Sequence, residues 1–365
     1  MNTPKIAVVI PTIRDLDFLK AWGNEFADCI GIIIEDRPKK EIKIPKNKFK
    51  KVFHYSWKEI DEDLGKNAWI IPRKNAGIRN YGFLKAYELS ANVTITLDDD
   101  CYPVKNQNFL QSHLKNLSLL APTDWFPTYP HIKYFYTRGF PYLVRDKKEV
   151  VMSHGLWSNI LDFDAKTHLK HPDLHMPVIN PNLLEFIPKN YFFPMCSMNL
   201  AFKTKITPVM YFPPMGYDNK GNHWGYDRFD DIWAGIFAKK IIDHLGYAVV
   251  NGSPFVEHRQ ASNINENLKK EAKGIKTNEV LYERVKEVAF ADENLKEAYG
   301  QPSGSLVDFI RAALGKYTFP TKRERVNKNF DSWLRQKEFT IEQILLLSQL
   351  KNRFVAGDNE ISADD

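Results

Sequence analysis

The pattern of apolar and polar positions predicts buried strands within the first hundred residues. Three short, unbroken apolar runs that are rich in β-branched residues span 6–10, 30–34 and 93–97. Such runs are typical of parallel strands that are buried on both faces. Stretches of helical character lie between them, at 16–26 and 78–89. This alternation predicts an α/β domain with a doubly wound sheet, whose ligands bind beyond the carboxyl ends of the strands.

The pattern loosens after Cys101 into a segment rich in aromatic residues and proline. Long irregular insertions in a compact domain are usually functional or mobile. We therefore expect the part from Trp125 to Trp157 to act as a lid that keeps water from the site. A helix over 229–245 and a strand over 248–251 complete the α/β part.

The composition changes again at about Asn265, where helical patterns and charged residues dominate. We divide the chain into a catalytic domain over 1–264 and a helical C-terminal extension over 265–365. The extension is expected to be separable from the chemistry but not from solubility or assembly.

Charge and cysteine content exclude several classes of protein. The net charge of +6 is too mild for a duplex nucleic-acid footprint, and it falls within 1–265 because residues 266–365 carry 17 basic and 17 acidic side chains. The three cysteines are widely spaced and form no CxxC pair, which argues against a disulfide framework or a zinc knuckle. No stretch approaches the roughly 20 apolar residues that span a bilayer. These features favour a cytoplasmic protein without integral membrane association.

An acidic triplet, Asp98, Asp99 and Asp100, directly follows the predicted strand VTITL. Adjacent carboxylates repel one another, and a shared divalent cation relieves that repulsion. One or two carboxylates completed by substrate phosphates are the usual arrangement for magnesium or manganese. The alternative interpretation is a solvated acidic turn, and the preceding strand favours the metal.

A strand that ends in acidic residues beside a nucleotide site resembles the GT-A fold of nucleotide-sugar transferases. Thr12 ends the first strand, where backbone groups of such folds meet the base. Asp36 closes the second strand, where a carboxylate can accept the N3 hydrogen of uracil. The segment RKNAGIRNYG supplies Arg79 and Asn80 for diphosphate and ribose. We therefore expect a GT-A-like mixed sheet with a C-terminal helical appendage.

Longer motifs resemble the reversibly glycosylated polypeptides, which act as UDP-arabinopyranose mutases in plants and have prokaryotic relatives. The matching stretches lie between Ile10 and about Ile275 and read IPTIRDLDFLKAW, LDDDCY, RGFPYLVR, SHGLWSNILDFDA, FPMCSMNLAF, RFDDIWAG and HRQASNINENLKKEAKGI. Several motifs longer than seven residues in the family's order make the signal specific. Ser197 stands where the family commonly has glycine.

The resemblance implies an enzyme that uses a divalent metal, Mn²⁺ or Mg²⁺, and no flavin to interconvert pyranose and furanose forms of a UDP-sugar. The chain has no GxGxxG motif that opens a helix after its first strand, which agrees with the absence of flavin. The family's self-glycosylated arginine falls on Arg138, and a second arginine needed for activity falls on Arg145. A guanidinium is a poor nucleophile but binds diphosphate well, so we expect Arg138 to contact phosphate or sugar rather than to form an obligatory covalent bond.

We assign the metal to Asp100 and, as a distant further ligand, to His258. Asp98 is expected to reach the ribose or uracil, and Asp99 also belongs to the nucleotide site. For each of these residues a plain structural role is the alternative.

The remaining candidates belong to the sugar end. Asp230 and Asp231 begin the predicted helix at 229–245, where the helix dipole favours ionised carboxylates, and at least one is a candidate for catalysis or sugar contact. His154 and Trp157 can supply a hydrogen bond and an aromatic wall, and Asn199 in FPMCSMNLAF completes the set. Core packing is the alternative for the aromatic residues.

We therefore expect a mutase of a UDP-pentose, UDP-L-arabinopyranose and UDP-L-arabinofuranose, that also glycosylates itself. A metal-dependent glycosyltransferase that passes sugar to a glycan acceptor is the first alternative. A scaffold or RNA-binding module is the second, but it leaves the acidic triplet unexplained. The expected partner is a UDP-sugar and not a nucleic acid, and a homo-oligomer is left open.

Overall fold

The computed structural model describes residues 4–121, 123–125, 136–142, 148–216, 226–259 and 263–287. The strands of this part are β1 (Ile6–Thr12), β2 (Ile30–Glu35), β3 (Lys51–Tyr55), β4 (Val93–Leu97), β5 (Cys101–Pro103), β6 (Leu120–Ala121), β7 (Lys148–Ile160), β8 (His175–Met176), β9 (Leu184–Phe186), β10 (Asn199–Lys203) and β11 (Ala248–His258). The α-helices are α1 (Trp57–Leu64), α2 (Arg79–Glu88), α3 (Phe109–Leu117), α4 (Ala165–Lys170), α5 (Asp230–His244) and α6 (Ile264–Glu287). Short 3₁₀ segments include η1 (Asp17–Lys20), η3 (Ala76–Ile78) and η5 (Thr204–Met210).

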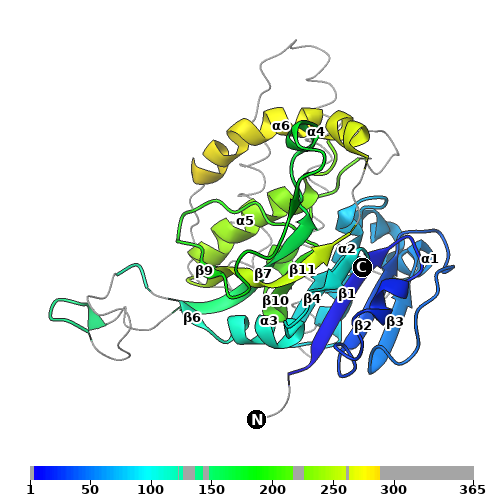
Figure 1. Cartoon of the computed structure of the whole chain (residues 1–365), viewed down its shortest axis with the longest axis horizontal. Coiled ribbons are helices and arrows are strands. Elements are labelled where there is room, and N and C mark those ends of the chain that lie inside the picture. Colours follow the sequence, from blue (N-terminus) through cyan, green and yellow to red (C-terminus); the bar gives the residue numbers. More distant parts are fainter. Residues whose placement is uncertain are drawn as a thin grey trace.

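The sheet is mixed, with the strand order β3-β2-β1-β4-β10-β7-β11-β5 (Figure 1). The first four strands are parallel to one another, and β10 is antiparallel to both β4 and β7. Strand β11 is parallel to β7. The carboxyl ends of β1, β2, β4, β7 and β11 therefore lie at one edge, together with the start of β10. That edge is where ligands bind in such sheets.

The strand pattern follows from alternate burial on two faces. Along β1, Ala7 and Val9 belong to one apolar cluster, whereas Val8 and Ile10 belong to another. Side chains of a strand alternate between faces, so a continuous apolar run is buried only when helices cover both faces. Helices α2 and α5 cover the first face, and α3 with η1 covers the second.

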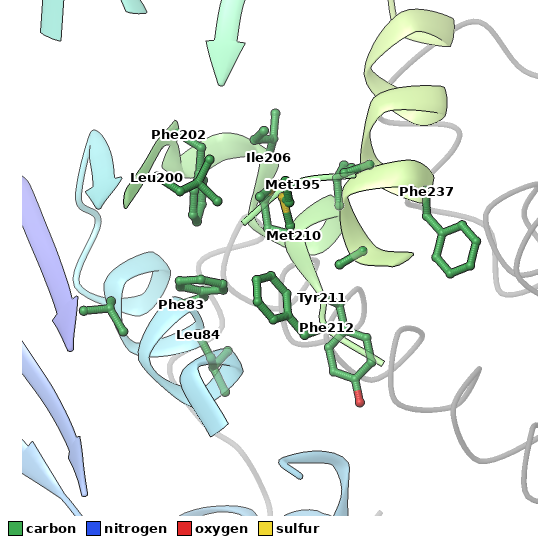
Figure 2. Packing of buried hydrophobic residues seen from close by; sticks show 14 of the residues in the cluster. Phe83, Leu84, Met195, Leu200, Phe202, Ile206, Met210, Tyr211, Phe212 and Phe237 are labelled. Atoms are coloured by element: carbon green, nitrogen blue, oxygen red, sulfur yellow. The ribbon is translucent and has the colours of Figure 1, made fainter. Parts of the chain in front are cut away.

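The first cluster packs α2 against β10 and η5. The ring of Phe83 meets those of Phe202 and Phe212 edge to face, with centroids 5.1 and 5.8 Å apart (Figure 2). Met195 and Met210 fill the same cluster. The α/β class and the mixed sheet expected from the sequence are confirmed. The three predicted strands are β1, β2 and β4, and the helices predicted at 78–89 and 229–245 are α2 and α5.

Two expectations are wrong. The stretch 16–26 forms only η1 and turns, because Gly23 adopts a left-handed φ of 54° that ends any helix. The expected lid between Trp125 and Trp157 includes most of β7, a central strand whose Val150, Val151 and Met152 are buried. Among the described helices, none combines the length and apolar character that a bilayer crossing requires.

Candidate functional site

A cavity of about 790 Å³ opens at the carboxyl edge of the sheet. Its walls come from the ends of β1 and β4, the segment 194–198 before β10, the start of α5, the segment 162–166 and one side of α6. This volume lies within the range of roughly 300–1,000 Å³ that is usual for small-molecule sites. The sequence analysis expected ligands at this edge, and the cavity opens there.

Asp98 and Asp99 are fixed by neighbouring side chains. Asp98 Oδ1 accepts a charge-assisted hydrogen bond from Arg79 Nη2 at 2.9 Å. Asp99 Oδ2 accepts from the Thr12 hydroxyl at 2.6 Å and pairs with Arg14 Nε at 3.0 Å. Burial raises the pKa of the Asp99 carboxyl, although Thr12 and Arg14 oppose this effect. The residues of the triplet therefore have different roles, and Asp99 connects the end of β1 to the end of β4 through its hydrogen bond with Thr12.

Asp100 and His258 face each other across the cavity rim. His258 Nε2 lies 3.8 Å from Asp100 Oδ1, which is too far for a hydrogen bond. His258 Nδ1 lies 2.8 Å from the carbonyl oxygen of Ile160, and a carbonyl only accepts, so Nδ1 carries the hydrogen. Nε2 is thereby turned toward the carboxylate. Burial, followed by the charge of Asp98, raises the pKa of Asp100 to about 6.

These groups fit a divalent cation. An imidazole that donates one ring N–H to a carbonyl and turns the other nitrogen to the site is the usual arrangement of a metal-ligating histidine. Within the described residues no set of three ligating side chains is already assembled. Magnesium and manganese are commonly coordinated by one or two protein side chains together with substrate phosphates, and the pair Asp100 and His258 agrees with this arrangement.

The start of α5 contributes two carboxylates to the cavity wall. Asp231 Oδ2 accepts the backbone N–H of Ser197 at 3.1 Å and its hydroxyl at 3.0 Å. Asp230 is buried, and its Oδ2 accepts the backbone N–H of Gly77 at 3.1 Å. Burial, then the charges of Asp230 and Asp162, raises the pKa of Asp231 to about 7. Asp231 can therefore hold or release a proton near neutral pH, whereas Asp230 anchors η3.

Arg79 lies in the cavity wall but is almost fully engaged by the protein. Its Nη1 donates to Thr96 Oγ1 and to the carbonyl of Ser197, both at 2.8 Å, and its side chain is 3% exposed. Asn80 pairs both atoms of its amide with the backbone of Phe212 at 2.9 Å and is not among the described residues that line the cavity. The structure thus brings Arg79, and not Asn80, to the site.

Asp36 lies at the end of β2, as expected, with both oxygens occupied. Trp57 Nε1 donates to Oδ1, and the backbone N–H of Lys74 donates to Oδ2, each at 2.7 Å. Burial raises the pKa of this carboxyl. Asp36 holds in place the segment where Lys74 adopts a φ of 61°, and Lys74 itself lines the cavity.

His154 and Asn199 form a buried polar network behind the site. His154 Nε2 accepts the backbone N–H of Cys196 at 3.0 Å, and its Nδ1 lies 2.8 Å from Asn251 Oδ1. Asn199 Oδ1 lies 2.9 Å from His113 Nε2, and its amide nitrogen donates to two carbonyls. Desolvation lowers the pKa of His154 and of His113 to about 4.

The indole of Trp157 packs edge to face on His154 at 5.8 Å. The network therefore supports the segment 194–198 from behind. None of His154, Trp157 and Asn199 is among the described residues that line the cavity.

Of the two arginines of the loop, only Arg138 is described, and it does not line the cavity. Arg138 lies on an exposed turn with Gly139 at a φ of 95°, and the described residues 136–142 do not line the cavity. Arg145 lies outside the described residues. The roles of Arg138 and Arg145 stay predictions.

Several lining residues were missed by the sequence reasoning. Arg14 pairs with the triplet from the loop after β1, and Arg228 lines the wall before α5. Asp162 acts on the pKa of Asp231, and Lys270 with Glu271 reaches the cavity from α6. Arg14 lies inside the quoted motif IPTIRDLDFLKAW and Asp162 inside SHGLWSNILDFDA, so the signal was present there. Glu271 lay in the extension that was expected to be separable.

The sequence model of the family described as reversibly glycosylated polypeptide matches residues 1–336. Among curated proteins, the chain is 40% identical over 282 residues to "Probable UDP-arabinopyranose mutase 1" of Pisum sativum, with 74% of each chain covered. It is 36% identical to "UDP-arabinopyranose mutase 3" of Arabidopsis thaliana, with 87% of this chain and 86% of that protein covered.

Among solved structures, glucosyl-3-phosphoglycerate synthase from Mycobacterium tuberculosis in complex with Mn²⁺, uridine-diphosphate and phosphoglyceric acid is similar at 10% identity and a TM-score of 0.38. The similarity covers 76% of this chain and 78% of that one.

Proposed function

This chain belongs to the reversibly glycosylated polypeptide family, and we propose that it is a UDP-sugar mutase that interconverts UDP-L-arabinopyranose and UDP-L-arabinofuranose without a flavin. The observation that carries the proposal is one cavity lined by two chemically different groups of side chains. Asp98, Asp100 and His258 form one group, and Asp231 with Asp162 forms the other. The first group suits a metal-bound diphosphate and is called the diphosphate end, and the second suits a polyhydroxylated sugar and is called the sugar end.

At the diphosphate end, Asp100 and His258 would hold a divalent cation, Mn²⁺ or Mg²⁺, that offsets charge on the departing UDP. Arg14 and Lys74 line the same region and supply positive charge for the phosphates. Arg79 fixes Asp98, and Thr12 fixes Asp99, so the nucleotide residues that we propose are preorganised by hydrogen bonds within the protein. Asp36 and Asn80 support the neighbouring segments.

At the sugar end, the proton balance of the reaction calls for a group such as Asp231. In the pyranose, O5 closes the ring and O4 carries a hydrogen, whereas in the furanose O4 closes the ring and O5 carries the hydrogen. Once the bond between C1 and UDP breaks, O4 bonds to C1 and gives its proton to Asp231. The C1–O5 bond then breaks, O5 takes up the proton, and UDP bonds to C1 again. A carboxyl group with a pKa of about 7 can serve in both directions. Asp230 holds η3 in place beside it.

Compartment and assembly belong to the proposal as well. Cys29, Cys101 and Cys196 are free and buried, which favours a reducing compartment such as the cytoplasm. A homo-oligomer and self-glycosylation at Arg138 belong to the same proposal.

The test is incubation of the purified protein with UDP-L-arabinopyranose and Mn²⁺ as the only other components. We expect UDP-L-arabinofuranose to accumulate to a constant ratio, as measured by anion-exchange chromatography. Chelation of the metal should stop the conversion. Sugar transfer that occurs only after a glycan acceptor is added, with no isomerised UDP-sugar, would contradict the mutase and support a glycosyltransferase.

A further inference from the structure

Helix α6 lies outside the sheet yet forms one wall of the cavity. Lys270, Ile275 and Glu279 are among its lining residues. Figure 1 shows α6 crossing over α4 on the side of the molecule where α5 lies. The helix is docked by specific contacts, because Trp233 Nε1 of α5 donates to Asn278 Oδ1 at 3.2 Å. The wall that it supplies is therefore part of the folded domain.

One residue of α6 joins the two sides of the cavity. Glu271 Oε1 accepts a hydrogen bond from Arg228 Nε at 3.0 Å, and Glu271 Oε2 accepts the backbone N–H of Ala165 at 3.0 Å. Arg228 belongs to the turn before α5 and has a left-handed φ of 61°. Ala165 begins α4. Glu271 is 7% exposed, so its carboxylate is largely shielded from water.

The two segments that Glu271 joins carry carboxylates that repel one another. Asp162 and Asp164 line the cavity just before α4, and Asp227 and Asp231 line it just before and at the start of α5. Burial raises the pKa of Asp231, and the charge of Asp162 adds to this effect, so the two segments interact. Because Glu271 is paired with Arg228, it binds both walls without adding net charge.

We propose that Glu271 is a positioning residue of the sugar end, which holds the acidic segments before α4 and before α5 on opposite sides of the bound sugar. This proposal rests on the proposed function, because that function names the sugar. Loss of Glu271 is expected to weaken binding of the sugar part of the substrate and not binding of UDP. The diphosphate end is built from β1, β4 and β11, which Glu271 does not contact in the described structure.

The experiment compares full-length wild type with Glu271→Gln, Arg228→Gln and Arg228→Lys by titration calorimetry with UDP and with UDP-L-arabinopyranose, each with Mn²⁺. Glu266→Gln is the matched control, because Glu266 is exposed on the same helix and pairs only locally with Lys269 at 2.7 Å. For Glu271→Gln and Arg228→Gln we expect UDP affinity within about twofold of wild type and UDP-arabinopyranose affinity weakened by about tenfold. Arg228→Lys keeps the charge and should keep most of the affinity.

The proposal is overturned if the Glu271→Gln variant binds UDP-arabinopyranose as tightly as the Glu266→Gln control does. It is also overturned if Glu271→Gln loses the same affinity for UDP as for UDP-arabinopyranose. Melting followed by circular dichroism shows whether each variant folds. If Glu271→Gln does not fold, a folded Arg228→Gln with unchanged affinity for UDP-arabinopyranose overturns the proposal. Wild type that binds both nucleotides but does not isomerise the sugar contradicts the mutase function alone, since the binding comparison still tests the role of Glu271.

Discussion

At the scale of single residues, burial raises the pKa of Asp231, the carboxyl that we propose as the acid and base, and the contact with Ser197 opposes this effect. Two donors from one residue stabilise the ionised form, while burial and neighbouring carboxylates oppose it. The balance leaves the group close to neutral pH. Its pKa is thus adjusted by a residue that differs from the family's common glycine.

Replacing Asp231 with Asn should lower kcat of the mutase reaction by roughly 10²–10⁴-fold, because the variant cannot carry a proton. UDP affinity should stay near that of wild type, since we propose that Asp231 acts on the sugar and not on UDP. Steady-state kinetics and calorimetry measure the two quantities. A variant with near wild-type kcat would remove Asp231 from the chemistry.

Ser197→Gly tests the adjustment itself. It removes the hydroxyl donor and keeps the backbone donor, so the carboxylate is less stabilised and the pKa of Asp231 should rise by about 0.5–1 unit. The bend in the pH profile of kcat, expected near 7 in wild type, should move to higher pH. Ser118→Gly, which changes an exposed serine after α3, is the control and should leave the bend in place. A shift to lower pH would contradict the argument.

Asp100→Asn should weaken the metal dependence of UDP binding. Loss of a carboxylate ligand is expected to reduce Mn²⁺ affinity by on the order of tenfold or more in the presence of UDP. Electron paramagnetic resonance of free Mn²⁺ measures this directly and needs no turnover. Asp17→Asn alters an exposed carboxylate that pairs with Lys20 and should behave as wild type. Unchanged Mn²⁺ enhancement in folded Asp100→Asn would exclude Asp100 as a ligand.

At the scale of elements, the approach of α5 to the segment 193–195 fixes the distance between Asp231 and Ser197. A Cβ on Gly235 would lie 2.4 Å from the backbone nitrogen of Met195 and 2.8 Å from the carbonyl oxygen of Phe193. Backbone atoms held in a packed core cannot move aside as a side chain can. The small residue is therefore a condition for the helix to reach the site.

Gly235→Ala should destabilise the fold although alanine favours helices. The propensity gain is about 1 kcal/mol, whereas overpacking against backbone costs about 1–3 kcal/mol and also shifts α5. We expect a net loss in the free energy of unfolding by urea and a lower kcat. Lys240→Ala, at a half-buried position on the same helix, should change stability by less than about 0.5 kcal/mol. Increased stability of Gly235→Ala would show that the approach is looser than described.

The sequence analysis predicted the helices and strands that have a clear local pattern of apolar and polar residues. It missed the elements whose polar residues are paired with residues far away in the sequence. Strands β1, β2 and β4 are continuous apolar runs, and α2 and α5 follow helical spacing. Strand β7 contains the polar residues Ser153, His154 and Asn159, which are paired with side chains of α3, β11 and β8, so the pattern of its 13 residues did not predict a strand.

For the same reason Asn199 and His154 were assigned to the sugar. Their partners, His113 and Asn251, are far away in sequence and invisible to spacing. The acidic triplet and His258 were found because a strand end or a motif marks them. Arg228 and Glu271 also lie inside quoted motifs, RFDDIWAG and HRQASNINENLKKEAKGI, but their hydrogen bond joins residues that are 43 apart in sequence and was not predicted.

At the scale of the whole molecule, the stability of the fold at acid pH depends on buried histidines and carboxyl groups, whose effects on the free energy of unfolding oppose each other. Folding lowers the pKa of His113 and His154 from about 6.5 to about 4, so the unfolded chain binds more protons between these values, and their contribution to stability falls as pH drops from 6.5 to 4. Asp100 and Asp231 act oppositely, because their pKa values are raised in the folded state. The difference in the free energy of unfolding between wild type and a variant that lacks one of these groups gives the contribution of that group.

The variant His113→Gln should be less stable than wild type at pH 7.5 because its buried bonds to Ser153 and Asn199 are altered. The deficit should shrink by up to about 3 kcal/mol between pH 7.5 and 4.5, since glutamine has no proton to gain on unfolding. Urea unfolding at several pH values measures the difference. A deficit that grows as pH falls would mean that His113 is protonated in the folded protein.

The antiparallel strand β10 also governs the order in which the sheet can be completed. Strands β1 to β4 are finished within residues 6–97, whereas β10, which covers the free edge of β4, spans residues 199–203. At a synthesis rate of roughly 5–20 residues per second, about 100 further residues leave that edge unpaired for several seconds on the ribosome. An open strand edge is a template for pairing with other chains. Nascent chains that end between β4 and β10 are therefore the ones that should depend most on chaperones and aggregate most readily.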